Sequence, residues 1–149
     1  MTRPATPLDI LVVEDEFLIA MDLGMIIEDA GHRVIGSAAS LQDVEALPGD
    51  VRPDLAFVDM QLARDTTGLQ VNAVIQARWP GTIVVFVTAN PKKIPDDFAG
   101  AHGLIAKPFT SMGVNAALAY LDRVMHETGP VPAAPGSLVA APALAMLRA

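Results

Sequence analysis

Five short runs of apolar residues alternate with segments of helical character, and this alternation limits the possible folds more than any other feature. The runs cover residues 10–13, 33–37, 55–58, 82–87 and 104–106. Each run is short enough to be a strand and too short to be an ordinary helix. Residues 82–87 are almost all β-branched or aromatic, which is typical of a buried strand. We therefore expect five strands.

Helices are expected between these strands and after the last one. They cover residues 16–30, 41–47, 68–78 and 91–99, and a final helix begins near Thr110 or Ser111 as its N-cap. Gly31 ends the first helix, since glycine commonly follows the last helical residue. Pro91 and Pro95 fall within the fourth helix and should make it short or irregular, because proline lacks the backbone N–H that a helix needs.

Strands that alternate with helices, without hairpin signals between them, indicate right-handed βαβ units and a parallel sheet. The expected fold class is therefore α/β, with a doubly wound five-stranded parallel sheet and helices on both faces. Spacing alone leaves the order of the strands open. In open sheets of this kind a ligand binds outside the carboxyl ends of the strands, so the polar residues there are the candidates for a functional site.

Composition excludes several functional classes. The chain has 149 residues, a net charge of −7 and only ten basic residues, which argues against nucleic-acid binding. It has no cysteine, which excludes disulfides, thiolate metal sites and cysteine nucleophiles. The first nine residues contain no hydrophobic signal region, and no uninterrupted apolar stretch reaches about 18 residues. We expect a cytoplasmic protein that does not insert into a membrane.

Polar side chains follow four of the five expected strands. They are Glu14 and Asp15 after the first strand, Asp59 after the third, Thr88 after the fourth and Lys107 after the fifth. Neighbouring carboxylates repel one another, and a hard cation with oxygen ligands such as Mg²⁺ relieves that repulsion. Asp59 could then attack phosphorus, while Lys107 neutralises charge on the phosphoryl oxygens and Thr88 donates a hydrogen bond to one of them.

Each of these residues, taken singly, also has an ordinary structural explanation. An acid after a strand is usually a loop or cap residue, and Glu14 with Asp15 could favour the start of the first helix. Thr88 could be a satisfied hydroxyl at the end of a strand. The prediction of a site rests on the joint occurrence of these groups at successive strand ends.

Four sequence motifs contain the residues at the ends of the expected strands, namely VVEDE (12–16), FVDMQL (57–62), VFVTAN (85–90) and AKPF (106–109). Together they resemble the receiver domain of response regulators from bacterial two-component systems. The resemblance extends over residues 8–126 and implies a flavodoxin-like order of five strands. It also implies a cis peptide bond before Pro108.

The resemblance assigns a role to each residue of the candidate site. Glu14 and Asp15 would be the acidic metal pair, and Asp59 would be both a metal ligand and the phosphoacceptor. Gln61 would lend its backbone carbonyl to Mg²⁺. Thr88 would be the switch hydroxyl, and Lys107 would pair with the phosphoryl group.

The implied function is a phosphorylation-dependent signalling switch. A histidine kinase or a histidine phosphotransfer protein would supply the phosphoryl group, and the domain would catalyse only its own phosphorylation and dephosphorylation. The residues after His126 are too few for a DNA-binding or catalytic output domain, so a stand-alone receiver is expected. Its output would be contact with a downstream protein that the sequence does not identify. The receiver could also form a homodimer.

Two departures from the receiver pattern leave alternatives open. Many receivers have Tyr or Phe three residues before the lysine, where this chain has Leu104, and the expected fourth helix contains two prolines. A receiver-fold interaction module that acts without phosphorylation is therefore an alternative. A phosphatase with an aspartyl nucleophile is a second rival, but such enzymes use an acid two residues after the nucleophile, where this chain has Gln61.

The segment 127–149 is rich in proline and alanine, and two interpretations apply to it. One is a flexible tail. The other is a short helix that docks on this domain or on a partner, because Leu138, Val139 and Leu144 are more apolar than a solvated tail needs. Met21, Met25, Met112 and Met125 could line a contact surface, but methionines at helical spacing are more often buried, so these four are expected in the core.

Overall fold

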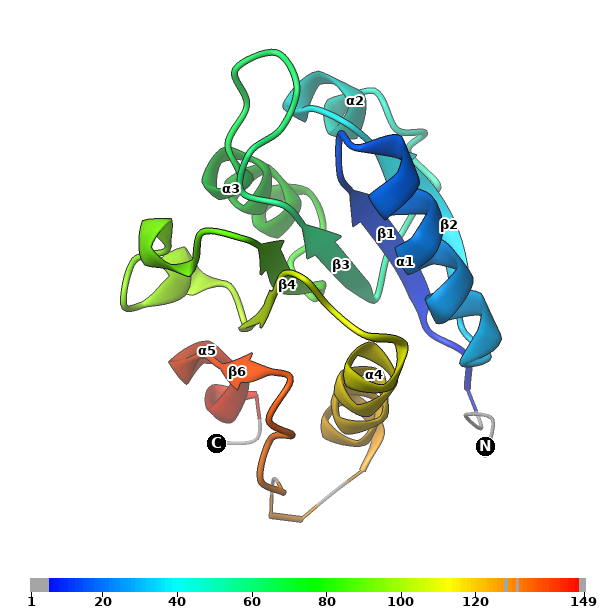
Figure 1. Cartoon of the computed structure of the whole chain (residues 1–149), viewed down its shortest axis with the longest axis vertical. Coiled ribbons are helices and arrows are strands. Elements are labelled where there is room, and N and C mark those ends of the chain that lie inside the picture. Colours follow the sequence, from blue (N-terminus) through cyan, green and yellow to red (C-terminus); the bar gives the residue numbers. More distant parts are fainter. Residues whose placement is uncertain (1–5, 128, 131, 148–149) are drawn as a thin grey trace.

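A computed structural model describes residues 6–127, 129–130 and 132–147 and folds them around one twisted sheet (Figure 1). Five strands run parallel in the order β2-β1-β3-β4-β5, and a sixth, β6, pairs antiparallel with β5. The strands are β1 (Asp9–Val13), β2 (Arg33–Ala38), β3 (Leu55–Val58), β4 (Ile83–Thr88), β5 (Gly103–Ala106) and β6 (Val139–Ala140). The parallel order is the flavodoxin-like one that the receiver resemblance implies.

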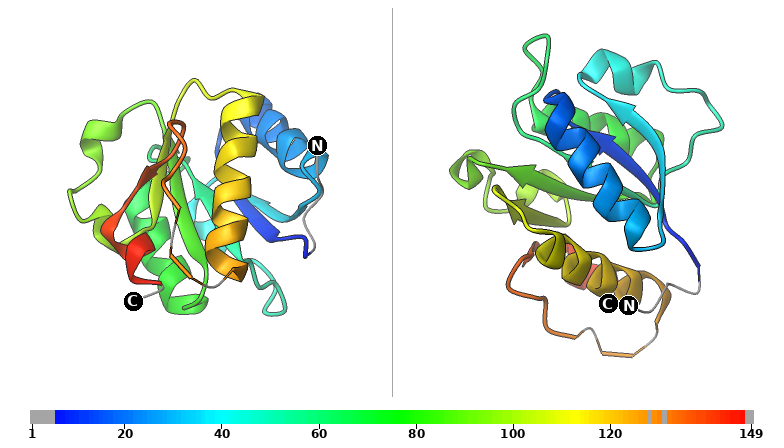
Figure 2. Two further views of the ribbon diagram at one scale, coloured as in Figure 1. Left: turned by 90° about the horizontal axis from the view of Figure 1, so that it is seen from below. Right: turned by 45° about the vertical axis from the view of Figure 1, so that its right-hand side comes forward.

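Helices cover both faces of the sheet, with α1 and α4 side by side on one face (Figure 2). They are α1 (Phe17–Asp29), α2 (Leu41–Glu45), α3 (Gly68–Arg78), α4 (Ser111–His126) and α5 (Pro142–Met146). Two hydroxyl caps fix the starts of α3 and α4. Thr110 Oγ1 accepts a hydrogen bond of 2.9 Å from the Gly113 N–H, as predicted, and Thr67 forms a capping box with Gln70.

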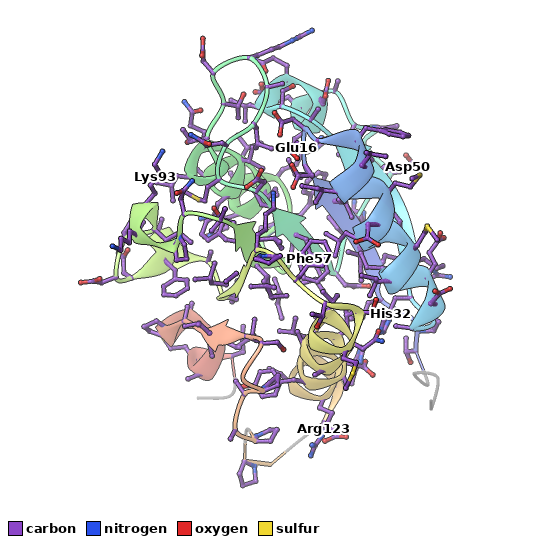
Figure 3. The ribbon with its side chains drawn as sticks, viewed as in Figure 1. Glu16, His32, Asp50, Phe57, Lys93 and Arg123 are labelled. Carbon is purple, nitrogen blue, oxygen red and sulfur yellow. The ribbon has the colours of Figure 1, made fainter. Side chains whose placement is uncertain are left out.

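The alternation of side chains along each strand divides the core into two apolar clusters. In β1, Ile10 and Val12 face the cluster under α1 and α4, whereas Leu11 and Val13 face the cluster under α2 and α3. Phe57 of β3 is fully buried in the first cluster, at the centre of the molecule in Figure 3. Burial of such a side chain stabilises the fold by about 1.5–3 kcal/mol.

The connection between β4 and β5 contains no α-helix, and the structure describes all of its residues. Two single 3₁₀ turns, η1 (Pro91–Lys93) and η2 (Phe98–Gly100), replace the helix, which is the irregular outcome that the prolines predict. Asn72 of α3 holds this connection, because its Nδ2 atom donates a hydrogen bond of 3.0 Å to the Ala99 carbonyl. The connection is therefore bound to α3 through η2, the second of its two 3₁₀ turns.

The C-terminal segment is ordered where the structure describes it, which excludes residues 128, 131, 148 and 149 of the range 127–149. It forms β6 and α5, so the five parallel strands that were expected are joined by one short antiparallel strand that was not. The two residues of β6 carry no alternating pattern, and only their pairing with Gly103 and Leu104 makes them a strand. Among the described residues, no helix is long and apolar enough to cross a membrane.

Three of the four methionines that were expected in the core lie at the surface instead. Met21 and Met25 on α1 are 47% and 58% exposed, and Met112 on α4 is 83% exposed, whereas Met125 packs against the core cluster under α1 and α4. Helical spacing shows which residues share a face, but not whether another part of the chain covers that face. In this chain, Leu23, Ile26 and Ile27 supply the buried side of α1.

Candidate functional site

The predicted site residues meet at one edge of the sheet, where the parallel strands end. Backbone pairing extends past the strands there, because the Glu14 N–H donates to the Ala38 carbonyl and the Asp59 N–H donates to the Val13 carbonyl, each at 2.9 Å. A cavity of about 360 Å³ opens at this edge. Its lining consists of Asp15, Glu16, Ile19, Asp59, Gln61, Thr88, Ala89, Asn90 and Lys107. Glu16, labelled in Figure 3 beside the start of α1, marks this end of the molecule.

Lys107 joins two of the carboxylates. Its Nζ atom lies 2.6 Å from Glu14 Oε1 and 3.3 Å from Asp59 Oδ2. The lysine follows β5, and the two acids follow β1 and β3, so the topology of the sheet brings the three side chains together. Both acids are largely buried, and their negative charges are neutralised mainly by this single ammonium group.

The close approach of these charges shifts the pKa values of Glu14 and Lys107. Burial raises the pKa of Glu14 to about 7, although the hydrogen bond from Lys107 and the backbone N–H of Glu16 act against this. Burial by itself would lower the pKa of Lys107. The hydrogen bond to Glu14 and the negative charge of Asp59 outweigh burial, so the pKa of Lys107 is raised. Lys107 is thus a permanent cation beside Asp59.

Glu14, Asp15 and Asp59 form an acidic triad that fits a divalent metal ion. One carboxylate oxygen from each lies within 4.8 Å of the others. Oxygen donors of this kind suit a hard cation such as Mg²⁺, which commonly binds to few protein carboxylates and keeps other positions for water and phosphate oxygens. Asp15 is exposed and faces the cavity, so a bound ion would remain open to a ligand from solvent.

Thr88 closes β4 beside the triad. Its Oγ1 atom accepts a hydrogen bond of 3.0 Å from the Asn90 N–H, and its carbonyl accepts one of 2.9 Å from the Lys107 N–H. Since the hydroxyl oxygen is an acceptor in that bond, its hydrogen can be donated to another group. The second bond links the backbone of Thr88 directly to that of Lys107.

Gly68 was not identified from the sequence, although it shapes the site. A Cβ atom at Gly68 would lie 2.5 Å from the Asp59 carbonyl oxygen, which is closer than non-bonded atoms can approach. The Gly68 N–H donates a hydrogen bond of 2.9 Å to the Met60 carbonyl, so the start of α3 packs directly on the backbone that carries Asp59. The only signal in the sequence is a glycine at the start of a helix.

The loop from Asp59 to Gly68 is a tight hairpin that carries Gln61. Gln61 and Thr67 form an antiparallel bridge, and the Thr66 N–H donates to the Ala63 carbonyl. Thr66 Oγ1 accepts from the Leu41 N–H, which ties the loop to the start of α2. Gln61 therefore has a fixed backbone at the edge of the cavity.

Residues 10–119 match the response regulator receiver domain. The chain belongs to this family. Receiver domains are phosphoacceptors in two-component signalling rather than conventional enzymes. As expected for a receiver, the peptide bond between Lys107 and Pro108 is cis.

Several similar proteins carry the name PhyR. The phyllosphere-induced regulator PhyR of Methylorubrum extorquens is 37% identical over 113 residues, which cover 74% of this chain and 42% of the relative. The solution structure of the PhyR receiver domain of Erythrobacter litoralis has a TM-score of 0.69 and 25% identity, over 85% of this chain and 97% of that one. This receiver thus spans less than half of the length of its Methylorubrum relative.

A further similar structure is that of PhyR from Bartonella quintana, which is called an anti-anti-sigma factor. It has a TM-score of 0.62 and 30% identity, over 74% of this chain and 45% of that one. The likeness to this receiver is limited to the part of each chain that aligns.

Proposed function

We propose that this receiver accepts a phosphoryl group on Asp59 from a histidine kinase or a histidine phosphotransfer protein, in a Mg²⁺-dependent reaction, and signals through protein–protein contact. The observation that carries the proposal is the position of Lys107 Nζ between Asp59 and Glu14, beside the third carboxylate, Asp15. A nucleophilic carboxylate, a metal-binding pair and a phosphate-pairing cation are the groups that phosphoryl transfer to an aspartate requires.

In the transfer step, the Asp59 carboxylate attacks the phosphorus of a phosphohistidine. A bond forms between phosphorus and the Asp59 oxygen while the bond from phosphorus to the imidazole nitrogen breaks, and that nitrogen keeps the electron pair. Glu14, Asp15, Asp59 and the Gln61 carbonyl would hold Mg²⁺, which would neutralise charge on the phosphoryl oxygens when bound. Lys107 pairs with one of these oxygens, and Thr88 donates its hydroxyl hydrogen to another.

An exposed apolar face on α1 supports a protein as the phosphodonor. Phe17 is 74% exposed and Leu18 is 71% exposed, and the surface methionines of α1 continue this face. Contiguous exposed apolar side chains commonly mark a surface that binds another protein. A groove of about 310 Å³ lies beside it, lined by Ile19, Asp22, Ala89, Lys107, Pro108 and Phe109. A donor on this face would place its phosphohistidine close to Lys107.

The test is labelling of Asp59 by acetyl phosphate with Mg²⁺, followed by mass spectrometry of the intact protein and its peptides. The wild-type chain should gain one phosphoryl group on Asp59, and removal of Mg²⁺ with a chelator should prevent the gain. Asp59→Asn should not be labelled, whereas the control Asp50→Asn, at an exposed loop position, should be labelled normally. Stoichiometric labelling of Asp59→Asn would contradict the proposal.

A receiver-fold module that acts without phosphorylation is the second candidate. It is favoured by Leu104, which is only 7% exposed and so already lies inside, and by the lack of an α-helix between β4 and β5. Partner binding measured with and without acetyl phosphate separates the two candidates. Equal affinity in both conditions would favour the module.

A further inference from the structure

The C-terminal segment occupies the outer edge of the sheet. The Ala141 N–H donates a hydrogen bond of 3.0 Å to the His102 carbonyl, and β6 pairs with β5 through Ala140 opposite Gly103 and Val139 opposite Leu104. In Figure 1, β6 and α5 lie together next to the edge of the sheet, away from α1. Without this segment, the outer backbone groups of β5 would be free to pair with another chain.

Two glycines make room for the segment. A Cβ atom at Gly103 would lie 3.0 Å from Leu138 Cδ1 and 3.1 Å from the Val139 carbonyl oxygen. At Gly113, in the first turn of α4, a Cβ atom would lie 3.2 Å from Ser137 Cβ. The segment therefore fits closely against both β5 and α4. We call the surface around Gly103 and Gly113 the edge seat.

The contacts at the edge seat are both polar and apolar. Ser137 Oγ donates a hydrogen bond of 2.7 Å to the Gly113 carbonyl. Leu138 is 4% exposed, Ala141 is 3% exposed and Leu144 is 1% exposed, and the two leucines belong to the core cluster under α1 and α4. The buried side chains are spaced three residues apart. The edge seat thus recognises an extended segment that continues into a short apolar helix.

The C-terminal segment is small and makes few contacts that stabilise its position on the domain. Its strand has two residues and its helix has five. Three of its large apolar side chains are exposed, namely Val139, Met146 and Leu147. The apolar burial of three residues is opposed by the conformational entropy lost when the whole segment becomes ordered. An element in this balance can leave its seat without unfolding the domain.

The edge seat is connected to the phosphoacceptor site through the backbone. Its two halves, Gly103 on β5 and Gly113 on α4, lie on either side of Lys107 in the sequence. Lys107 directly follows β5 and contacts Asp59 and Glu14 in the unphosphorylated protein. A phosphoryl group adds about −1.5 to −2 charges at pH 7 and would draw Lys107 toward its oxygens. If the backbone follows Lys107, that movement would change the spacing of the two halves that the segment must bridge.

We propose that the edge seat is the output surface of this receiver, occupied by its own C-terminal segment until Asp59 is phosphorylated. Release of the segment on phosphorylation rests on the proposed function, because it requires phosphorylation of Asp59. The edge seat itself does not depend on that function. When the segment leaves, the seat accepts a partner with the same chemistry, an extended strand followed by a short helix with apolar residues three apart. The resident segment is then a competitive inhibitor within the chain.

A peptide with the sequence of residues 136–147, carrying a fluorescent label, tests the seat in the full chain. We expect little binding to the unphosphorylated wild-type protein, because its own segment competes. Leu144→Ala weakens the resident segment and should raise peptide affinity at least tenfold without phosphorylation, and Ser137→Ala should raise it by less. The matched control Met146→Ala, at an exposed position of the same helix, should leave it unchanged. Equal peptide affinity of the Leu144→Ala and Met146→Ala variants would contradict the proposal that the edge seat binds this segment.

Phosphorylation provides the second arm of the test. Acetyl phosphate with Mg²⁺ should raise peptide affinity for the wild-type chain, and hydrogen exchange of the Ala141 amide should become faster. Labelling of Asp59 is measured in the same sample by mass spectrometry. Labelling without any change in peptide affinity or Ala141 exchange would overturn the coupling and leave the proposed function standing. Absence of labelling would overturn both, while the Leu144→Ala result would still decide whether the seat exists.

Discussion

The Nζ atom of Lys107 lies 2.6 Å from Oε1 of Glu14, although 93 positions separate these residues in the sequence. The contact crosses two strands, since Glu14 follows β1 and Lys107 follows β5, with β3 and β4 between them. The same ammonium group reaches Asp59, which follows β3. The charge balance of the site is therefore a property of the whole parallel sheet.

Replacement of Lys107 should slow the phosphorylation of Asp59. In Lys107→Met the phosphoryl oxygens lose their fixed cation, and removal of one such group commonly slows a reaction by about a hundredfold or more. The initial rate of Asp59 labelling by acetyl phosphate at saturating Mg²⁺ measures the effect. Lys92→Met, at an exposed position of η1, is the control and should keep the wild-type rate. Equal rates in the two variants would show that Lys107 has no part in the transfer.

Asp15→Asn should weaken Mg²⁺ binding and leave the fold intact. Asp15 is exposed, and loss of one carboxylate charge from an oxygen-ligand site lowers metal affinity, here by on the order of tenfold. Titration calorimetry with Mg²⁺ measures the affinity. Exposed substitutions usually change the free energy of unfolding by less than about 0.5 kcal/mol, which urea denaturation would check. The exposed Glu45→Gln on α2 should change neither quantity, and an unchanged affinity in Asp15→Asn would remove Asp15 from the metal site.

Gly68→Ala should disturb Asp59 directly. The new methyl group would need the space 2.5 Å from the Asp59 carbonyl oxygen, so the start of α3 and the Asp59 backbone must move apart. Overpacking of this kind destabilises a protein by about 1–3 kcal/mol. We expect lower unfolding free energy and slower labelling of Asp59. Gly81→Ala, where nothing lies within 4 Å of the added atom, is the matched control and should be neutral in both measurements.

Two histidines should make the fold less stable in mild acid. His32 Nδ1 accepts a hydrogen bond of 2.9 Å from the Leu8 N–H, and His102 Nδ1 accepts one of 3.0 Å from the Val84 N–H. Burial lowers the pKa of both histidines from the ordinary value of 6.5, with Asp122 opposing the effect at His32. A protonated ring nitrogen cannot accept these bonds, so the folded state favours the neutral form.

The sign of the pH effect follows from this difference in proton binding. Below about pH 6.5 each histidine binds more protons in the unfolded chain than in the folded one, so its contribution to the unfolding free energy falls as pH falls through its lowered pKa. Glu14, whose pKa is raised, contributes with the opposite sign, so the histidine effect is measured as a difference between the wild type and a histidine variant. The slope should reach up to about 1.4 kcal/mol per pH unit for each histidine. Urea denaturation between pH 7.5 and 5 measures it. His102→Asn retains an acceptor near the Nδ1 position without titrating in this range, and should reduce the slope; an unchanged slope would assign the acid sensitivity elsewhere.

The sequence by itself determined the five parallel strands and the residues at their carboxyl ends. Apolar runs such as 55–58 and 83–87 form strands from local pattern, and parallel connections leave little choice about which ends meet. Asp59, Thr88 and Lys107 were identifiable because each directly follows or ends such a run. The receiver resemblance then added the strand order, which pattern alone does not provide, and the prediction that the backbone carbonyl of Gln61 binds the metal.

Only the tertiary structure decided how the chain closes its outer edge and which groups lose contact with water. Val139 and Ala140 form a strand because Gly103 leaves room for them, and that relationship joins residues more than thirty positions apart with no periodic signal. The same holds for His32, which is only 6% exposed although it follows a glycine in a loop. Local pattern determines what each segment tends to form. Whether a segment is buried or paired depends on which other segment packs against it, and these contacts form only when the whole sheet is assembled.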